Sequence, residues 1–285
     1  MKEKVLVTGA TGAIGQEIVK ALLTHHVCMR IAVRDTQKMN ELNTGRCPVV
    51  YFDYGKPQTF KEAFQGITSL FLSAPMNYPR MDELILPALI YARDNGVQHV
   101  VSLGAIGSDI ESESPLMIAE KCIQGCGMDY TILRPNLLMQ NFRYLAGPSI
   151  QKTGKIHLPA GDAKISFVDS RDVAQSAALA ILNKEHRNRI YSLTGRESLD
   201  HYMVASILSR VTGREITYIP VSHNEAWKEL KETGMDDESV ELVIGLYEIA
   251  RHGWCKDVHP DLREILGAEP ISFDKFAEDY KETGI

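Results

Sequence analysis

Three glycines near the start of the sequence constrain the fold more than any other feature. Gly9, Gly12 and Gly15 follow the short apolar run 5–7, and apolar residues at helical spacing continue from Ile14 to Leu23. A buried strand that turns directly into an amphipathic helix has this pattern. Glycines at such a turn let the main chain approach a pyrophosphate and let the helix pack close to the strand. The stretch therefore predicts a dinucleotide-binding turn with phosphates at the helix N-terminus.

The spacing of the glycines leaves an alternative open. It is G-x-x-G-x-x-G, whereas many dehydrogenases have G-x-G-x-x-G. Glycine triplets alone are weak evidence, and a tight turn in another kind of α/β protein also fits. The strand before the turn and the amphipathic helix after it favour cofactor binding.

Strand and helix patterns alternate over the first two thirds of the chain. Strands are expected at 28–34, 49–53, 68–73, 99–104 and 129–135, with helical segments between them. This alternation predicts an α/β protein with a doubly wound parallel sheet and right-handed crossovers. From about residue 194 the pattern is mainly helical, apart from a short strand at 215–220, which predicts a smaller C-terminal lobe.

The domain prediction follows from this change of pattern. We expect a cofactor-binding core over 1–150, to which 163–195 returns. We expect a lobe formed by 151–162 and 196–285 to close over the substrate, because ligand sites favour clefts between such parts.

Composition excludes several classes of function. The net charge of −6 argues against a protein that binds nucleic acid directly, and the longest apolar runs are too short to span a membrane. The beginning of the sequence has no signal-peptide pattern. The five cysteines are odd in number and scattered, so we expect a reducing, cytoplasmic environment and no disulfide framework. Cys122 and Cys126 lie one helical turn apart and would suit a metal, but buried thiols are expected because no second ligand pair accompanies them.

Residues after the predicted strands give the cofactor expectations. Arg34 stands 19 residues after Gly15, where a guanidinium would bind the 2′-phosphate of NADP(H). Asp35 follows directly and keeps NAD(H) possible, and Arg34 also suits the exposed end of a strand. Asp53 ends the third strand and is expected beside the adenine. Ser73, Ala74 and Pro75 follow the fourth strand and are expected to face the ribose and nicotinamide.

Taken in order, the motifs resemble a known family. The chain is similar to the NmrA-like branch of the atypical short-chain dehydrogenase/reductases, and within it to reductases of iminium alkaloids, triphenylmethane dyes and quinones. The similarity extends over nearly the whole chain, and the motifs are specific only as a set. They are Val7-Thr-Gly-Ala-Thr-Gly-Ala-Ile-Gly15, Ala32-Val-Arg34, Asp53-Tyr54, Thr131-Ile-Leu-Arg-Pro135 with Asn141-Phe142, and Phe167-Val-Asp-x-x-Asp-Val-Ala174, with Ser73-Ala-Pro75 and the segment 270–278 carrying the closer resemblance.

The resemblance implies an extended Rossmann fold, usually with NADP(H), and assigns site residues. It places the turn at the pyrophosphate, Arg34 at the 2′-phosphate and Asp53-Tyr54 near the adenine. It also places Ser73 to Pro75 and Leu103-Gly104-Ala105 along the nicotinamide ribose. The pyrophosphate residues that it implies are Gly9, Thr11, Gly12, Ala13 and Ile14.

One departure from the wider superfamily bears on the chemistry. That superfamily uses Tyr-x-x-x-Lys as proton donor and ribose ligand, and no tyrosine in this sequence is followed four residues later by lysine. The corresponding helix carries Leu116 where many NmrA-like proteins have lysine, and Lys121 is expected to point to a different face. Loss of a general acid typically costs about 10²- to 10⁴-fold in rate.

Two functions fit these features. The first is an NAD(P)H-dependent reductase of an electrophilic small molecule, such as an iminium, quinone or cationic dye, that needs no proton from the enzyme. Tyr78, Tyr144 and His157 are weak candidates for polar pocket groups, and the segment 136–144 either lines a substrate pocket or forms a core helix. The second is a non-catalytic NADP(H) sensor that acts through a protein partner.

Overall fold

The computed structural model describes residues 4–35, 47–74, 78, 80–110 and 113–282. The chain forms two compact units. Unit 1 comprises residues 1–134, 170–192 and 264–267, and unit 2 comprises residues 135–169, 193–263 and 268–285. The predicted boundary at residue 150 thus differs from the start of unit 2. The assignment of cofactor and substrate functions to these parts stays a prediction.

A seven-stranded sheet forms the centre of unit 1, in the order β3-β2-β1-β4-β5-β6-β8. Neighbouring strands from β3 through β6 pair in parallel. Bonds from Asn188 N to Tyr130 O and from Asn136 N to Leu193 O show that β8 runs in the same direction as β6. This arrangement confirms the predicted doubly wound sheet. The strands are β1 (Lys4–Val7), β2 (Cys28–Val33), β3 (Val49–Tyr51), β4 (Ser69–Leu72), β5 (His99–Leu103), β6 (Asp129–Pro135) and β8 (Arg189–Leu193).

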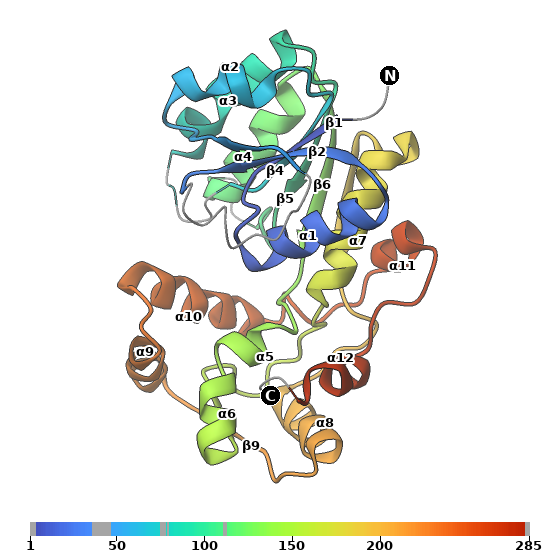
Figure 1. Cartoon of the computed structure of the whole chain (residues 1–285). Coiled ribbons are helices and arrows are strands. Elements are labelled where there is room, and N and C mark those ends of the chain that lie inside the picture. Colours follow the sequence, from blue (N-terminus) through green and yellow to red (C-terminus); the bar gives the residue numbers. More distant parts are fainter. Residues whose placement is uncertain (1–3, 36–46, 75–77, 79, 111–112, 283–285) are drawn as a thin grey trace. The chain divides into compact units, whose positions relative to one another are not determined.

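Helices cover both faces of this sheet (Figure 1). One face carries α1 (Ala13–Thr24) and α7 (Ser170–Leu182), which pack closely against each other. The other face carries the remaining helices of the sheet, whose apolar residues share one core with β3 and β4. These are α2 (Phe60–Phe64), α3 (Met81–Asp94) and α4 (Pro115–Gly125), and the unit also contains the short turns η2 (Pro57–Thr59) and η3 (Lys184–His186) and the end of α11 (Asp261–Leu266).

Unit 2 is mainly helical, as predicted for the C-terminal lobe. Its two strands, β7 (Lys155–Leu158) and β9 (Thr217–Pro220), pair in parallel. A strand was expected at β9 but not at β7, because four residues between turns carry too little periodicity to separate a strand from a loop. The helices are α5 (Asn141–Tyr144), α6 (Gly147–Thr153), α8 (His201–Thr212), α9 (His223–Glu232), α10 (Asp237–Arg251) and α12 (Phe273–Tyr280).

An aromatic core holds unit 2 together. Phe142 packs edge-on against Phe167 and Phe273, with ring centroids 5.2 Å apart in both pairs. Met139 and Phe142 are each 1% exposed. Of the two interpretations of the segment 136–144, the core interpretation therefore holds for these side chains, whereas Tyr144 is exposed at the end of α5.

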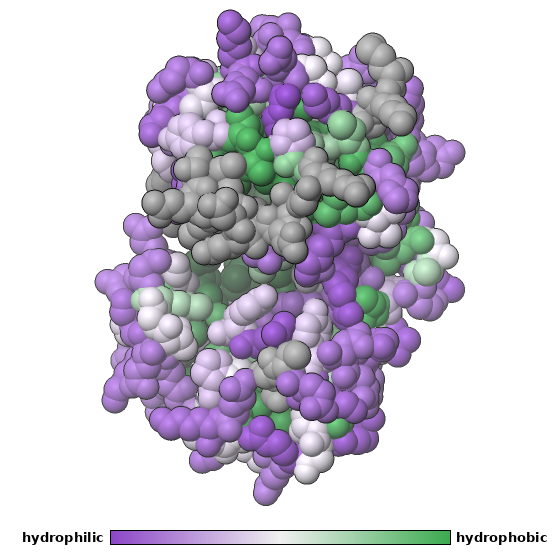
Figure 2. Space-filling model, in the orientation of Figure 1, coloured by the Kyte–Doolittle hydropathy of each residue, from purple (hydrophilic) through white to green (hydrophobic). Residues whose placement is uncertain are grey.

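The outer surface is mainly hydrophilic on the face drawn in Figure 2. None of the helices in the described part of the chain is long and apolar enough to cross a membrane. All five cysteines are free thiols. Cys126 is buried, as expected, whereas Cys122 is only half-buried.

Candidate cofactor site

The predicted site residues follow strands that end at one edge of the sheet in unit 1. β1 lies between β2 and β4 and is parallel to both, so the chain leaves β1 toward one side and later returns on the other. Such a reversal leaves a crevice at the carboxyl ends of the strands, where open α/β sheets bind ligands. Gly9, Arg34, Ser73 and Gly104 all follow strands that end at this edge.

The glycine turn is shaped by close packing at two of its three glycines. Gly9 has φ +67°, and a Cβ there would lie 2.7 Å from the Cβ of Ser73. A Cβ on Gly15 would lie 2.1 Å from Gly9 O, because α1 packs directly on the turn. A Cβ on Gly12 would meet only Gly9 O, at 3.4 Å, and Gly12 is exposed. Gly12 therefore leaves a bare main-chain surface on the open side of the turn.

The N-terminus of α1 is left without a side-chain cap. Gly12 is the N-cap residue, and the first turn carries no acidic side chain. Thr11 and Ala13 are exposed, and Ile14 is half-buried. The first N–H groups of a helix have no partner within it and carry partial positive charge. The turn is thus a cradle that suits a phosphate group.

Arg34 and Tyr54 come together beside this cradle. Arg34 is exposed, whereas Tyr54 is 9% exposed. Burial raises the pKa of the Tyr54 hydroxyl, which donates a hydrogen bond to Thr8, while the nearby charge of Arg34 acts in the opposite direction. The Asp53 carboxylate turns back into its own loop, where it accepts from Gly55 N at 3.0 Å and lies 3.7 Å from the ammonium of Lys56.

The hydroxyl of Thr8, which was not among the predicted site residues, joins three strand ends. It accepts from Tyr54 Oη at 3.0 Å and from Ser73 N at 2.9 Å, and it donates to Phe71 O at 3.1 Å. Thr8 is 2% exposed, so water does not replace these bonds. The sequence feature that could have identified Thr8 is its position directly after β1, because a polar residue there faces the ends of the neighbouring strands.

Thr8→Val should lower the free energy of unfolding by about 2–4 kcal/mol, because it leaves the Ser73 N–H and the buried Tyr54 hydroxyl without an acceptor. Thr24→Val is a matched control, because the exposed Thr24 hydroxyl only donates to Lys20 O within α1. Urea titrations of both variants give the comparison. A Thr8→Val protein as stable as the control would show that the hydroxyl does not join the strand ends.

The residues predicted to lie along the ribose and nicotinamide are half-buried where the structure describes them. Ser73 and Ala74 follow β4, and Leu103, Gly104 and Ala105 surround the end of β5. Pro75 lies outside the described residues. The helix that carries the Tyr-x-x-x-Lys pair in the wider superfamily is α4. Here the buried polar residue of that helix is Glu120, which forms an ion pair with Arg134.

The three weak candidates for catalysis are divided between the two units. Tyr78 is 42% exposed in unit 1, and Tyr144 is 54% exposed in unit 2. His157, on β7 of unit 2, lies 2.8 Å from the carboxylate of Glu229 on α9. Their roles stay predictions.

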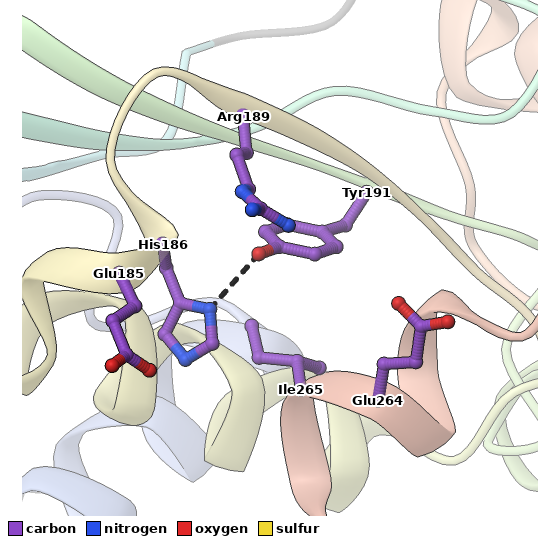
Figure 3. A pocket seen from close by; sticks show the side chains of 6 residues that line it. All are labelled: Glu185, His186, Arg189, Tyr191, Glu264 and Ile265. Atoms are coloured by element: carbon purple, nitrogen blue, oxygen red, sulfur yellow. Dashed lines mark hydrogen bonds between the residues drawn. The ribbon is translucent and has the colours of Figure 1, made fainter.

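A separate hollow of about 250 Å³ lies near the starts of β6 and β8. Figure 3 shows the ring of His186 directed at the hydroxyl of Tyr191, with 2.9 Å between His186 Nδ1 and Tyr191 Oη. Arg189, Glu185 and the α11 residues Glu264 and Ile265 complete its lining. Because it lies toward the amino ends of these strands, it is distinct from the crevice at the carboxyl edge.

Known proteins resemble this chain along its length. It is 29% identical over 280 residues to NAD(P)H azoreductase of Xenophilus azovorans, covering 96% of each chain. It is 26% identical to quinone oxidoreductase 2 of Escherichia coli, covering 92% of this chain and 93% of the relative. The structure of Citrobacter sp. triphenylmethane reductase complexed with NADP(H) superposes with a TM-score of 0.83 at 24% identity, covering 98% and 99% of the two chains. The model of the NmrA-like family matches residues 1–252, and the chain belongs to this family.

Proposed function

We propose that the protein is an NAD(P)H-dependent oxidoreductase that transfers hydride to an electrophilic small molecule, with NADP(H) as the preferred cofactor. The observation that supports this most is the glycine cradle, where Gly12 exposes main chain and the N-terminus of α1 has no cap. The names of the azoreductase and quinone reductase relatives support the same class of reaction.

Different residues at the carboxyl edge would bind different parts of the cofactor. The turn formed by Gly9, Thr11, Gly12, Ala13 and Ile14 would bind the pyrophosphate through main-chain N–H groups. Arg34 would bind the 2′-phosphate, and Asp53 and Tyr54 would line the adenine. The bound nicotinamide supplies the hydride. Ser73, Ala74 and Pro75, together with Leu103, Gly104 and Ala105, would hold the ribose beside it.

The absence of a Tyr-x-x-x-Lys pair favours particular acceptors. An iminium ion or a cationic dye becomes neutral when it accepts hydride, and a reduced quinone takes its proton from water. For such acceptors the main task of the protein is to hold the two reactants together. A ketone needs a proton in the same step, and this chain has no Tyr-x-x-x-Lys pair to supply it.

Oxidation of NADPH, followed by absorbance, tests the proposal on four acceptors. We expect turnover with a quinone, a cationic triphenylmethane dye and a cyclic iminium, and little with a simple ketone. Tight NADPH binding without turnover of any acceptor would favour the NADP(H) sensor instead. Rapid reduction of the ketone would show that a proton donor exists, and Tyr78, Tyr144 and His157 would be substituted next.

Arg34→Ala should weaken NADPH binding by about tenfold or more and NADH binding by less than twofold, since only NADPH carries the 2′-phosphate that the guanidinium would pair with. Fluorescence titration with both cofactors measures the ratio. Arg30→Ala, within the strand that Arg34 follows, is a control, because Arg30 Nη1 instead donates to the carbonyls of Glu62, Ala63 and Gln65. Equal losses for the two cofactors in Arg34→Ala would remove Arg34 from the 2′-phosphate.

A further inference from the structure

A buried carboxylate lies directly behind the loop assigned to the nicotinamide ribose. Glu120 on α4 is 2% exposed. A Cβ added to Gly104 would lie 2.6 Å from Glu120 Oε1, so the carboxylate rests against the main chain of Gly104. Because Gly104 directly follows β5, the side chain supports the carboxyl edge of the sheet from inside unit 1.

Hydrogen bonds fix both oxygens of this carboxylate. Oε1 accepts from Ser108 Oγ at 2.9 Å and from Arg134 Nε at 3.1 Å. Oε2 accepts from Arg134 Nη2 at 2.6 Å. The guanidinium, at the end of β6, also donates from Nη1 to Asp109 Oδ2 at 2.6 Å. Glu120 and Arg134 therefore connect α4, β6 and the loop that follows Gly104.

The same loop is fastened by its main chain. Gly104 N donates to Leu133 O at 2.8 Å, and Ser108 N donates to Ala105 O at 3.1 Å. Ser114 Oγ, at the N-cap of α4, donates to Ser108 O at 2.9 Å. The path of residues 104–108 is thus set from the side of α4, and the carboxylate of Glu120 is the central contact of this support.

Fold stability alone does not account for such a pair. A buried ion pair contributes little more to stability than apolar side chains of the same volume, because desolvation offsets the attraction. A fully hydrogen-bonded network instead restricts its surroundings to one arrangement. The group whose arrangement is restricted here is the main chain of Gly104.

We propose that Glu120, held by Ser108 and Arg134, is a positioning residue that sets the main chain at 103–105 for the nicotinamide half of the cofactor. The proposal rests on the cofactor assignment made under the proposed function. A positioning residue at this place affects one end of the dinucleotide, whereas a merely structural pair would affect both ends or neither.

Two ligands separate these effects by calorimetry. NADP⁺ contains the nicotinamide half, and adenosine 2′,5′-bisphosphate lacks it. Glu120→Gln keeps the shape of the side chain and removes its charge, and Ser108→Ala removes one hydrogen bond while keeping the ion pair. Both variants should bind NADP⁺ more weakly, by about tenfold for Glu120→Gln. Both should bind the bisphosphate within about twofold of the unaltered protein.

Asp129→Asn is the matched control, because the Asp129 carboxylate pairs with Arg187 at 2.8 Å at the start of β6, away from the carboxyl edge. It should leave both affinities unchanged. Equal weakening of the two ligands by Glu120→Gln, or no weakening of NADP⁺, would overturn the positioning role while leaving the cofactor assignment intact. If the unaltered protein bound neither ligand, the proposed function itself would fail.

Discussion

Gly12→Val is expected to weaken NADPH binding by about 100-fold while the protein keeps its fold. The added side chain would stand on the open side of the turn, where a Cβ meets only Gly9 O at 3.4 Å. It would block the approach of the pyrophosphate to the N-terminus of α1. Loss of two hydrogen bonds to a charged group, at about 1.5 kcal/mol each, corresponds to this loss of affinity.

The other glycines of the turn provide the contrast. Gly15→Ala should destabilise the fold itself, since its Cβ would lie 2.1 Å from Gly9 O. Gly125→Val, at the end of α4 with no atom within 4 Å of the added Cβ, should change neither cofactor affinity nor fold stability appreciably. Fluorescence titrations with NADPH and thermal melts of the three variants give the comparison. Unchanged affinity in Gly12→Val would show that the turn is not the cofactor site.

The free energy of unfolding should fall steeply as the pH falls from about 6.5 to 4. Burial lowers the pKa of His201 to about 4, and burial together with the charge of Arg187 lowers the pKa of His99 to about 4. Each imidazole is neutral in the folded protein and takes up a proton on unfolding below pH 6.5. The stabilising contribution is therefore complete above pH 6.5 and is lost toward pH 4, by about 3 kcal/mol for each histidine.

The surroundings of His201 explain its low pKa. The ring is packed among Phe142, Phe167, Tyr218 and Tyr247, with centroids 5.0–5.6 Å away. Neither ring nitrogen has a hydrogen-bond partner among the described residues. Asp200, the N-cap of α8, favours the protonated form, but burial outweighs it.

His201→Phe should clearly reduce the dependence on pH, because it removes one of the two buried imidazoles with a pKa of about 4. His259→Phe is the control at an exposed histidine of unit 2 and should keep the full slope. Urea titrations from pH 4.5 to 7 measure these slopes, which are less sensitive to altered packing than the absolute stabilities. A His201→Phe protein with the unaltered slope would contradict the assignment.

The parallel sheet could be predicted because each of its buried strands is a short apolar run bounded by turn residues, whereas the order of the strands comes from the structure. Such runs can be recognised in the sequence without knowing which other segments they contact. β7 could not be predicted for the opposite reason. Its four residues are too few to show a clear period, and the partner that makes them a strand, β9, lies far along the chain.

The candidate site shows the same division between local and distant information. The glycine turn is local, so Gly9, Gly12 and Gly15 were visible in sequence. The networks around Thr8 and Glu120 were not, because they join residues 63 and 14 positions apart in the chain. Glu120 lies on a buried face of α4, where it pairs with Arg134 at the end of β6.

Direct hydride transfer is the central claim, and NADPH that carries deuterium at C4 of the nicotinamide tests it most directly. A cationic triphenylmethane dye is the suitable acceptor, because a deuterium received at its central carbon does not exchange with water. We predict deuterium at that carbon from only one of the two C4 positions, together with a slower single turnover. A reduced dye that contains no cofactor deuterium, or that takes its hydrogen from solvent, would contradict the account.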